Sequence, residues 1–70
     1  MGPGSISSQR VTLLAATYEL DPAQVGHDAE IVAAWTASED ELIVWFEARY
    51  GWRTEYSASY VAFLRRAVTD

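Results

Sequence analysis

The segment SEDELIVWFEARYG, residues 38–51, decides the fold, because it carries the start, middle and end of one α-helix. Ser38 and Glu41 match a capping box, in which a hydroxyl and a carboxylate three residues apart satisfy free backbone amides of the first turn. The acids at its start and Arg49 near its end both complement the helix dipole. Gly51 suits the left-handed conformation that commonly follows a last helical turn. We therefore predict a helix over residues 39–50.

Five consecutive apolar residues inside this segment, LIVWF at positions 42–46, would also suit a buried β-strand. The capping residues before the run and the glycine after it fit a helix instead. The chain also offers no obvious second strand to pair with this one. The helix is therefore the preferred interpretation.

The N-terminal part of the chain predicts two further elements. Apolar residues at helical spacing indicate a helix over residues 8–20, which Asp21-Pro22 would end, because proline disfavours a helical conformation in the residue before it. The same pair can open a new turn, since proline is tolerated at the first helical position. We expect a single helical turn over residues 22–25.

Two more helices are predicted after that turn. Gly26 and His27 are expected to end the turn, and Asp28 is expected to cap a helix that runs through Trp35. The last helix should begin somewhere in residues 54–57 and extend toward the C-terminus, since both ends of that interval offer a hydroxyl cap.

These elements predict an all-α fold, a compact bundle of four short helices, or of five if the turn at residues 22–25 is counted. The opening MGPGS, residues 1–5, has the character of an expression-vector leftover. Residues 6–70 are then expected to form a single helical domain, which is about as small as a domain that folds alone can be.

Composition narrows the classes of function. The 70 residues include no cysteine and one histidine, and the net charge is −5. We expect no metal and no cofactor, because the usual zinc ligands are nearly missing. Nucleic acid is not the expected partner, because phosphate binding depends on clustered Lys and Arg. No apolar run reaches the ~20 residues of a membrane span, so we expect no membrane partner and a cytoplasmic location.

No catalytic residue is assigned, and the chain is predicted not to be an enzyme. It has neither the Gly-x-Ser-x-Gly motif of hydrolases nor a phosphate-binding glycine loop. His27 is interpreted as a polar turn residue beside the predicted cap. The consecutive acids at residues 39–41 are interpreted as partners of the helix dipole, since neighbouring helical residues do not converge on one face.

The aromatic residues predict a protein-binding surface instead. The chain has three Trp, four Tyr and two Phe, and the helix over residues 39–50 is apolar on most of its circumference. Few neighbouring elements are available to cover so much apolar area, so some aromatic side chains should stay exposed and mark a binding site. The candidate partner-binding residues are Trp45, Arg49, Tyr50, Trp52, Arg53 and Tyr56, which are of the types enriched at binding hot spots.

The expected partner is another protein, with a second copy of the chain, forming a homodimer, as one candidate. The domain would then serve as a docking or adaptor module, or as a small regulatory protein. A purely structural alternative remains open, in which Tyr50 and Trp52 fold over the end of the bundle and clamp the corner between the last two helices.

A second class of function is helix-turn-helix DNA binding through the C-terminal helix. Residues 38–67 have the outline of that motif, and the last helix would enter the major groove. The acidic net charge opposes this alternative. The polar residues that would face the bases are Tyr56, Ser57, Ser59, Arg65 and Arg66.

The segment over residues 42–58 is also similar to the LisH-type dimerisation motif. The similarity lies in the aliphatic pair at 42–43, Phe46, the Gly51-Trp52 corner and the small pair Ser57-Ala58. Glu47 stands where that motif has an apolar residue, and the small pair comes two positions late. The resemblance implies a homodimer, and no family is assigned from it.

Overall fold

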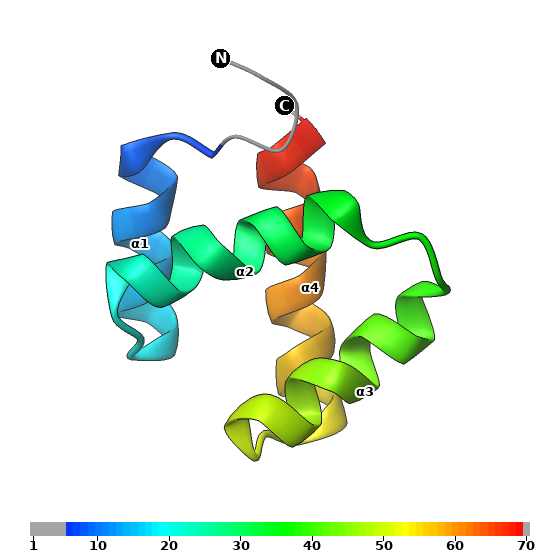
Figure 1. The fold of residues 1–70 in the computed structure, drawn as a ribbon. Coiled ribbons are helices and arrows are strands. Elements are labelled where there is room, and N and C mark those ends of the chain that lie inside the picture. The colour runs from blue at the N-terminus through cyan, green and yellow to red at the C-terminus, as the bar shows by residue number, and fades with distance from the viewer. Residues whose placement is uncertain (1–5, 70) are drawn as a thin grey trace.

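The computed structural model describes residues 6–69, which form four α-helices and no strand (Figure 1). The predicted all-α bundle is thus confirmed, while the proposed leftover at residues 1–5 lies outside the described residues. The helices are α1 (Ser8–Tyr18), α2 (Pro22–Ala34), α3 (Glu39–Tyr50) and α4 (Thr54–Thr69).

The core lies where α4 packs against α2 and α3, while α1 packs mainly against α2. Each helix buries one stripe of side chains, and α4 buries residues spaced by three or four positions, as a helix facing a core should. Most of these side chains are fully buried. The core consists of Leu14, Ala15, Tyr18, Val25, Ala29, Val32, Leu42, Phe46, Tyr60, Val61 and Leu64.

The helix α3 begins and ends where the sequence predicts. The Ser38 hydroxyl accepts a bond from the backbone N–H of Glu41, and the Glu41 carboxylate accepts one from the backbone N–H of Ser38. Gly51 adopts the left-handed conformation with φ of 71° and donates its N–H to the Glu47 carbonyl. Both ends of α3 are therefore set by local hydrogen bonds and not by distant contacts.

The helix α2 corrects the prediction for residues 22–35. The expected turn and the helix after it are one continuous helix, so the fifth helix that the sequence left open does not form. Asp21 caps this helix, with Gln24 completing a capping box. Gly26 and His27 lie inside it, and Asp28 is a buried residue of its middle and not an N-cap.

Burial explains why this helix continues through a glycine. Val25, Ala29 and Val32 follow each other at spacings of four and three residues, and all three are fully buried. A glycine in a helix costs about 1 kcal/mol relative to alanine. Burying the apolar stripe on both sides of Gly26 outweighs that cost.

The other boundaries differ by small amounts. The helix α1 ends at Tyr18, two residues before the predicted end, because Glu19 turns left-handed with φ of 57°. The helix α4 runs from Thr54 to Thr69, so both predicted capping residues, Thr54 and Ser57, lie inside it. No helix within residues 6–69 is both long and apolar enough to cross a membrane.

Replacing Gly26 by alanine tests the continuity of α2. No atom lies within 4 Å of a Cβ built at this position, so Gly26→Ala should raise the free energy of unfolding by about 0.5–1 kcal/mol in urea titrations. The matched variant Gly51→Ala should lower it, because the left-handed conformation strains any Cβ. Equal destabilisation by both variants would mean that residue 26 lies in a turn.

Candidate functional site

A buried carboxylate joins three helices. Asp28 of α2 is fully buried, and its Oδ2 accepts hydrogen bonds from the Tyr60 hydroxyl of α4 at 2.7 Å and from the Tyr50 hydroxyl of α3 at 2.5 Å. The Nε atom of Arg49 lies 3.4 Å from Oδ1. A buried charge is tolerated when it is paired and hydrogen-bonded in this way. We call these four residues the polar centre.

The polar centre changes the proton affinity of its tyrosines. Burial raises the pKa of Tyr60 far above its ordinary value of 10.0, and its hydrogen bond to Asp28 acts in the same direction. The same two causes raise the pKa of Tyr50. Both hydroxyls therefore stay protonated as donors to Asp28 throughout the physiological range, which suits a structural role.

This arrangement predicts alkaline unfolding. A tyrosine with a raised pKa in the folded state stabilises the fold fully below its unfolded-state pKa and loses that contribution as the pH rises toward its folded-state value. The free energy of unfolding should therefore fall steeply above about pH 10. Urea titrations followed by circular dichroism over a pH series would measure it. The variant Tyr60→Phe should lose less stability over the same interval, and an equal loss would contradict the assignment.

The predicted contact residues form a row across the α3–α4 corner. The Arg49 guanidinium lies over the rings of both Trp45 and Tyr50, at 5.4 and 5.3 Å from their centroids. Tyr50 stacks on Trp52 at 4.5 Å, and Trp52 meets the edge of Tyr56 at 4.8 Å. Five of the six predicted residues are thus brought together.

Most of this row also serves the fold. Trp52 contacts Tyr18 of α1 and Tyr60 of α4 at 5.7 and 5.1 Å, so it closes one end of the core. Trp45, Tyr50 and Trp52 are half-buried, whereas Tyr56 and Arg53 are exposed. The structural alternative, in which Tyr50 and Trp52 clamp the corner, is consistent with these contacts.

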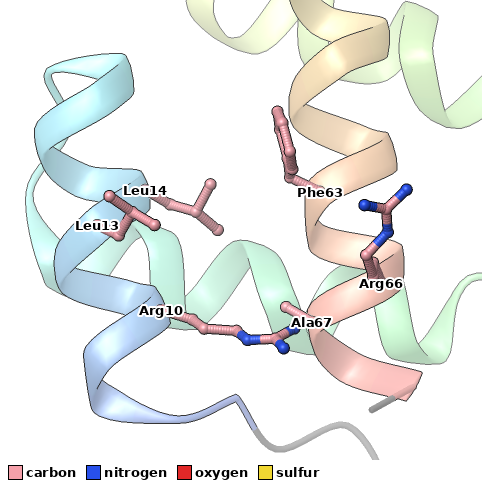
Figure 2. Close-up of a pocket in the computed structure, with 6 residues that line it drawn as sticks. All are labelled: Arg10, Leu13, Leu14, Phe63, Arg66 and Ala67. Carbon is pink, nitrogen blue, oxygen red and sulfur yellow. The ribbon is translucent and has the colours of Figure 1, made fainter.

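A groove that no sequence pattern predicted lies between α1 and α4 (Figure 2). Its volume is about 180 Å³ and its lining is almost entirely apolar. Leu13 on one side is 64% exposed and Phe63 on the other is 48% exposed. Both are large apolar side chains that the domain itself does not cover. The lining residues are Arg10, Leu13, Leu14, Phe63, Arg66 and Ala67.

Phe63 shows why the groove was missed. In the sequence, Phe63 falls at helical spacing with Tyr60 and Leu64, yet its side chain is 48% exposed. The buried stripe of α4 runs through Tyr60, Val61 and Leu64, so Phe63 lies beside it and faces the groove. Helical spacing alone could not separate these two faces, because both carry apolar residues.

Within residues 6–69, no three acidic or histidine side chains gather as metal ligands would. His27 is exposed on α2. Glu39 of the acidic cluster contacts Arg65 of α4 at 3.3 Å, and Arg65 also donates to the Val32 carbonyl. These polar contacts hold helices together.

Comparisons with known proteins do not identify the chain. No protein family, no curated protein and no solved structure matches it. The candidate sites are therefore the groove, the polar centre and the aromatic row, by which we mean Trp45, Tyr50, Trp52 and Tyr56 at the α3–α4 corner.

Proposed function

We propose that this domain is a non-enzymatic protein-interaction module of the docking or adaptor kind. The observation that carries the proposal is the pair Leu13 and Phe63, which stand exposed on opposite sides of one apolar groove. Single exposed apolar residues are common on any protein. Two large ones that flank a shared hollow are typical of a surface that a partner covers.

The aromatic row at the α3–α4 corner is a second candidate contact surface. Tyr56 is 41% exposed at its end, and Arg53, in the loop before α4, is also exposed. A partner that covers this row would use residue types that dominate binding hot spots. The same rings already pack against the core, so this row supports the proposal less strongly than the groove does.

Site-specific photo-crosslinking tests the proposal on the intact protein in cells that express it natively. The photoreactive residue would replace Phe63 at the groove, Tyr56 at the aromatic row, or Glu30 as an exposed control on α2. We expect a discrete protein adduct from Phe63, from Tyr56 or from both, and none from Glu30. If neither position yields an adduct beyond the control, the proposal fails.

Self-association is one form that such binding can take. Sedimentation velocity over a wide concentration series would measure it, because a homodimer shows a sedimentation coefficient that rises with concentration. A monomer at every concentration would leave another protein as the partner. If the protein forms a dimer and Tyr56→Ala dissociates it, then the aromatic row is part of the interface between the two copies.

The helix-turn-helix alternative predicts DNA binding through α4. Several features weigh against it: α4 lies at the centre of the bundle, and Arg65 is held by Glu39 and the Val32 carbonyl. The net charge of −5 acts in the same direction. Titration with random-sequence duplex at low salt separates the two classes, and we expect no binding.

A further inference from the structure

The groove has a definite shape. The helices α1 and α4 run antiparallel (Figure 1) and meet at Tyr18, whose hydroxyl lies 2.7 Å from the Ser59 hydroxyl and whose ring meets the edge of Tyr60 at 4.9 Å. Arg10 and Ala67 lie at the other end of the groove, where the Arg10 side chain extends toward α4, and α2 crosses behind the space between the two helices (Figure 2). The groove is therefore bounded at one end by the Tyr18 contact, is lined by residues of α1 and α4, and is open to solvent.

We propose that this groove binds a short amphipathic helix of a partner protein, one that inserts an apolar side chain between Leu13 and Phe63 and places carboxylates beside Arg66. This inference rests on the proposed function and names the site and the partner's chemistry. It differs from the sequence prediction, which placed the contact at the α3–α4 corner.

The size of the hollow favours side chains over a free small molecule. Its volume of about 180 Å³ is below the roughly 300–1,000 Å³ of typical ligand pockets. On α1 the lining extends from Arg10 to Leu14, which is about one helical turn of 5.4 Å. A space of that length accepts one or two anchoring side chains, and a helix lying between two helices presents them at i and i+4.

The charge at the rim favours an acidic partner. The domain has a net charge of −5, and five arginines are its only Lys or Arg residues. Arg66 lines the groove, and Arg10 lines it from the opposite helix. A cationic edge on an otherwise acidic surface attracts carboxylates and repels basic segments.

The same charge argues against a second copy as the occupant. A symmetric dimer formed through this groove would bring the same patch of both copies together. The lining of the groove offers no carboxylate to Arg66 of the other copy, and two chains of charge −5 would repel each other at longer range. A different protein with acidic residues beside its apolar anchor avoids both penalties.

Fluorescence anisotropy with designed peptides tests this inference on the whole domain. The probe is a capped, alanine-based helix with Leu at i and i+4 and Glu in the adjacent turns. One control peptide carries Lys in place of every Glu, and another carries Ala in place of both Leu. We expect the acidic Leu peptide to bind, and each control to bind at least about tenfold more weakly.

Variants of the protein locate the binding site. Leu13→Ala and Phe63→Ala should each weaken the acidic peptide about tenfold or more, and Arg66→Glu should weaken it while improving the Lys peptide. Val44→Ala is the matched control, because Val44 is 60% exposed on α3, away from the groove, and it should leave affinity unchanged. All four positions are exposed or lie at the rim, and circular dichroism would verify that each variant folds.

Specific outcomes overturn the inference. It fails if the acidic peptide does not bind, if the three peptides bind equally, or if Val44→Ala weakens binding as much as Phe63→Ala. Self-association that Phe63→Ala abolishes would make a second copy the occupant and would also overturn it. A photo-crosslink from Tyr56 without one from Phe63 would refute the groove while leaving the proposed function intact.

Discussion

Replacing Asp28 by alanine should lower the free energy of unfolding by about 3 kcal/mol. The variant removes the acceptor of two tyrosine hydroxyls, and the hydroxyl of Tyr60 is then left in the core without its partner. An unsatisfied buried donor costs about 1–3 kcal/mol, and each hydrogen bond to a charged group contributes about 1.5–3 kcal/mol. A chain of this length has roughly 4–10 kcal/mol in total, so the variant should be close to unfolded at moderate urea.

Urea titration followed by circular dichroism measures this effect, and two variants control it. Glu30→Ala, an exposed position on the same helix, should change stability by less than about 0.5 kcal/mol. The triple variant Asp28→Leu, Tyr50→Phe, Tyr60→Phe should recover most of the loss, because it removes both hydroxyl donors together with their acceptor. Arg49 stays in this variant, but its side chain is 32% exposed and water can solvate it. A triple variant no more stable than Asp28→Ala would contradict the assigned role of the polar centre.

Replacing Phe46 by alanine should cost about 3–5 kcal/mol, the range for deleting a buried aromatic ring. Phe46 is fully buried. Its ring meets Trp45 and Tyr60 edge-on at 5.0 and 5.4 Å and lies parallel to Tyr50. The helix α3 buries only one other residue fully, Leu42, so the Phe46 ring supplies a large part of its apolar contact with the core.

Thermal or urea unfolding of Phe46→Ala measures this cost. Val44→Ala is the matched control, since Val44 lies two positions away on the same helix and is 60% exposed. Its stability should stay within about 0.5 kcal/mol of the wild type. Comparable losses from the two variants would mean that α3 packs by a different face.

Helix bounds could be predicted from the sequence where they depend only on residues close in the chain. The bounds of α3 follow from Ser38, Glu41 and Gly51, which act within one turn of the helix ends. The middle of α2 was mispredicted because Gly26, His27 and Asp28 resemble a turn and a cap when taken alone. Burial of the stripe around them decides the helix, and burial depends on the other three helices.

The polar centre and the groove are formed by residues far apart in the sequence, so no local sequence pattern reveals them. Asp28 meets Tyr50 and Tyr60 across 22 and 32 positions of sequence. The row of aromatic residues was foreseen as a cluster because its members are close in sequence. The groove was not, since Leu13 and Phe63 lie on helices at opposite ends of the chain and become neighbours only through the antiparallel arrangement of α1 and α4.

Heteronuclear NMR titration of the labelled domain with the acidic Leu peptide tests most directly whether the groove between α1 and α4 is the binding surface. Saturable shift changes should concentrate at Leu13, Leu14, Phe63 and Ala67, with little change at Trp52 and Tyr56. Changes centred on the α3–α4 corner, or no saturable change at all, would contradict binding in the groove.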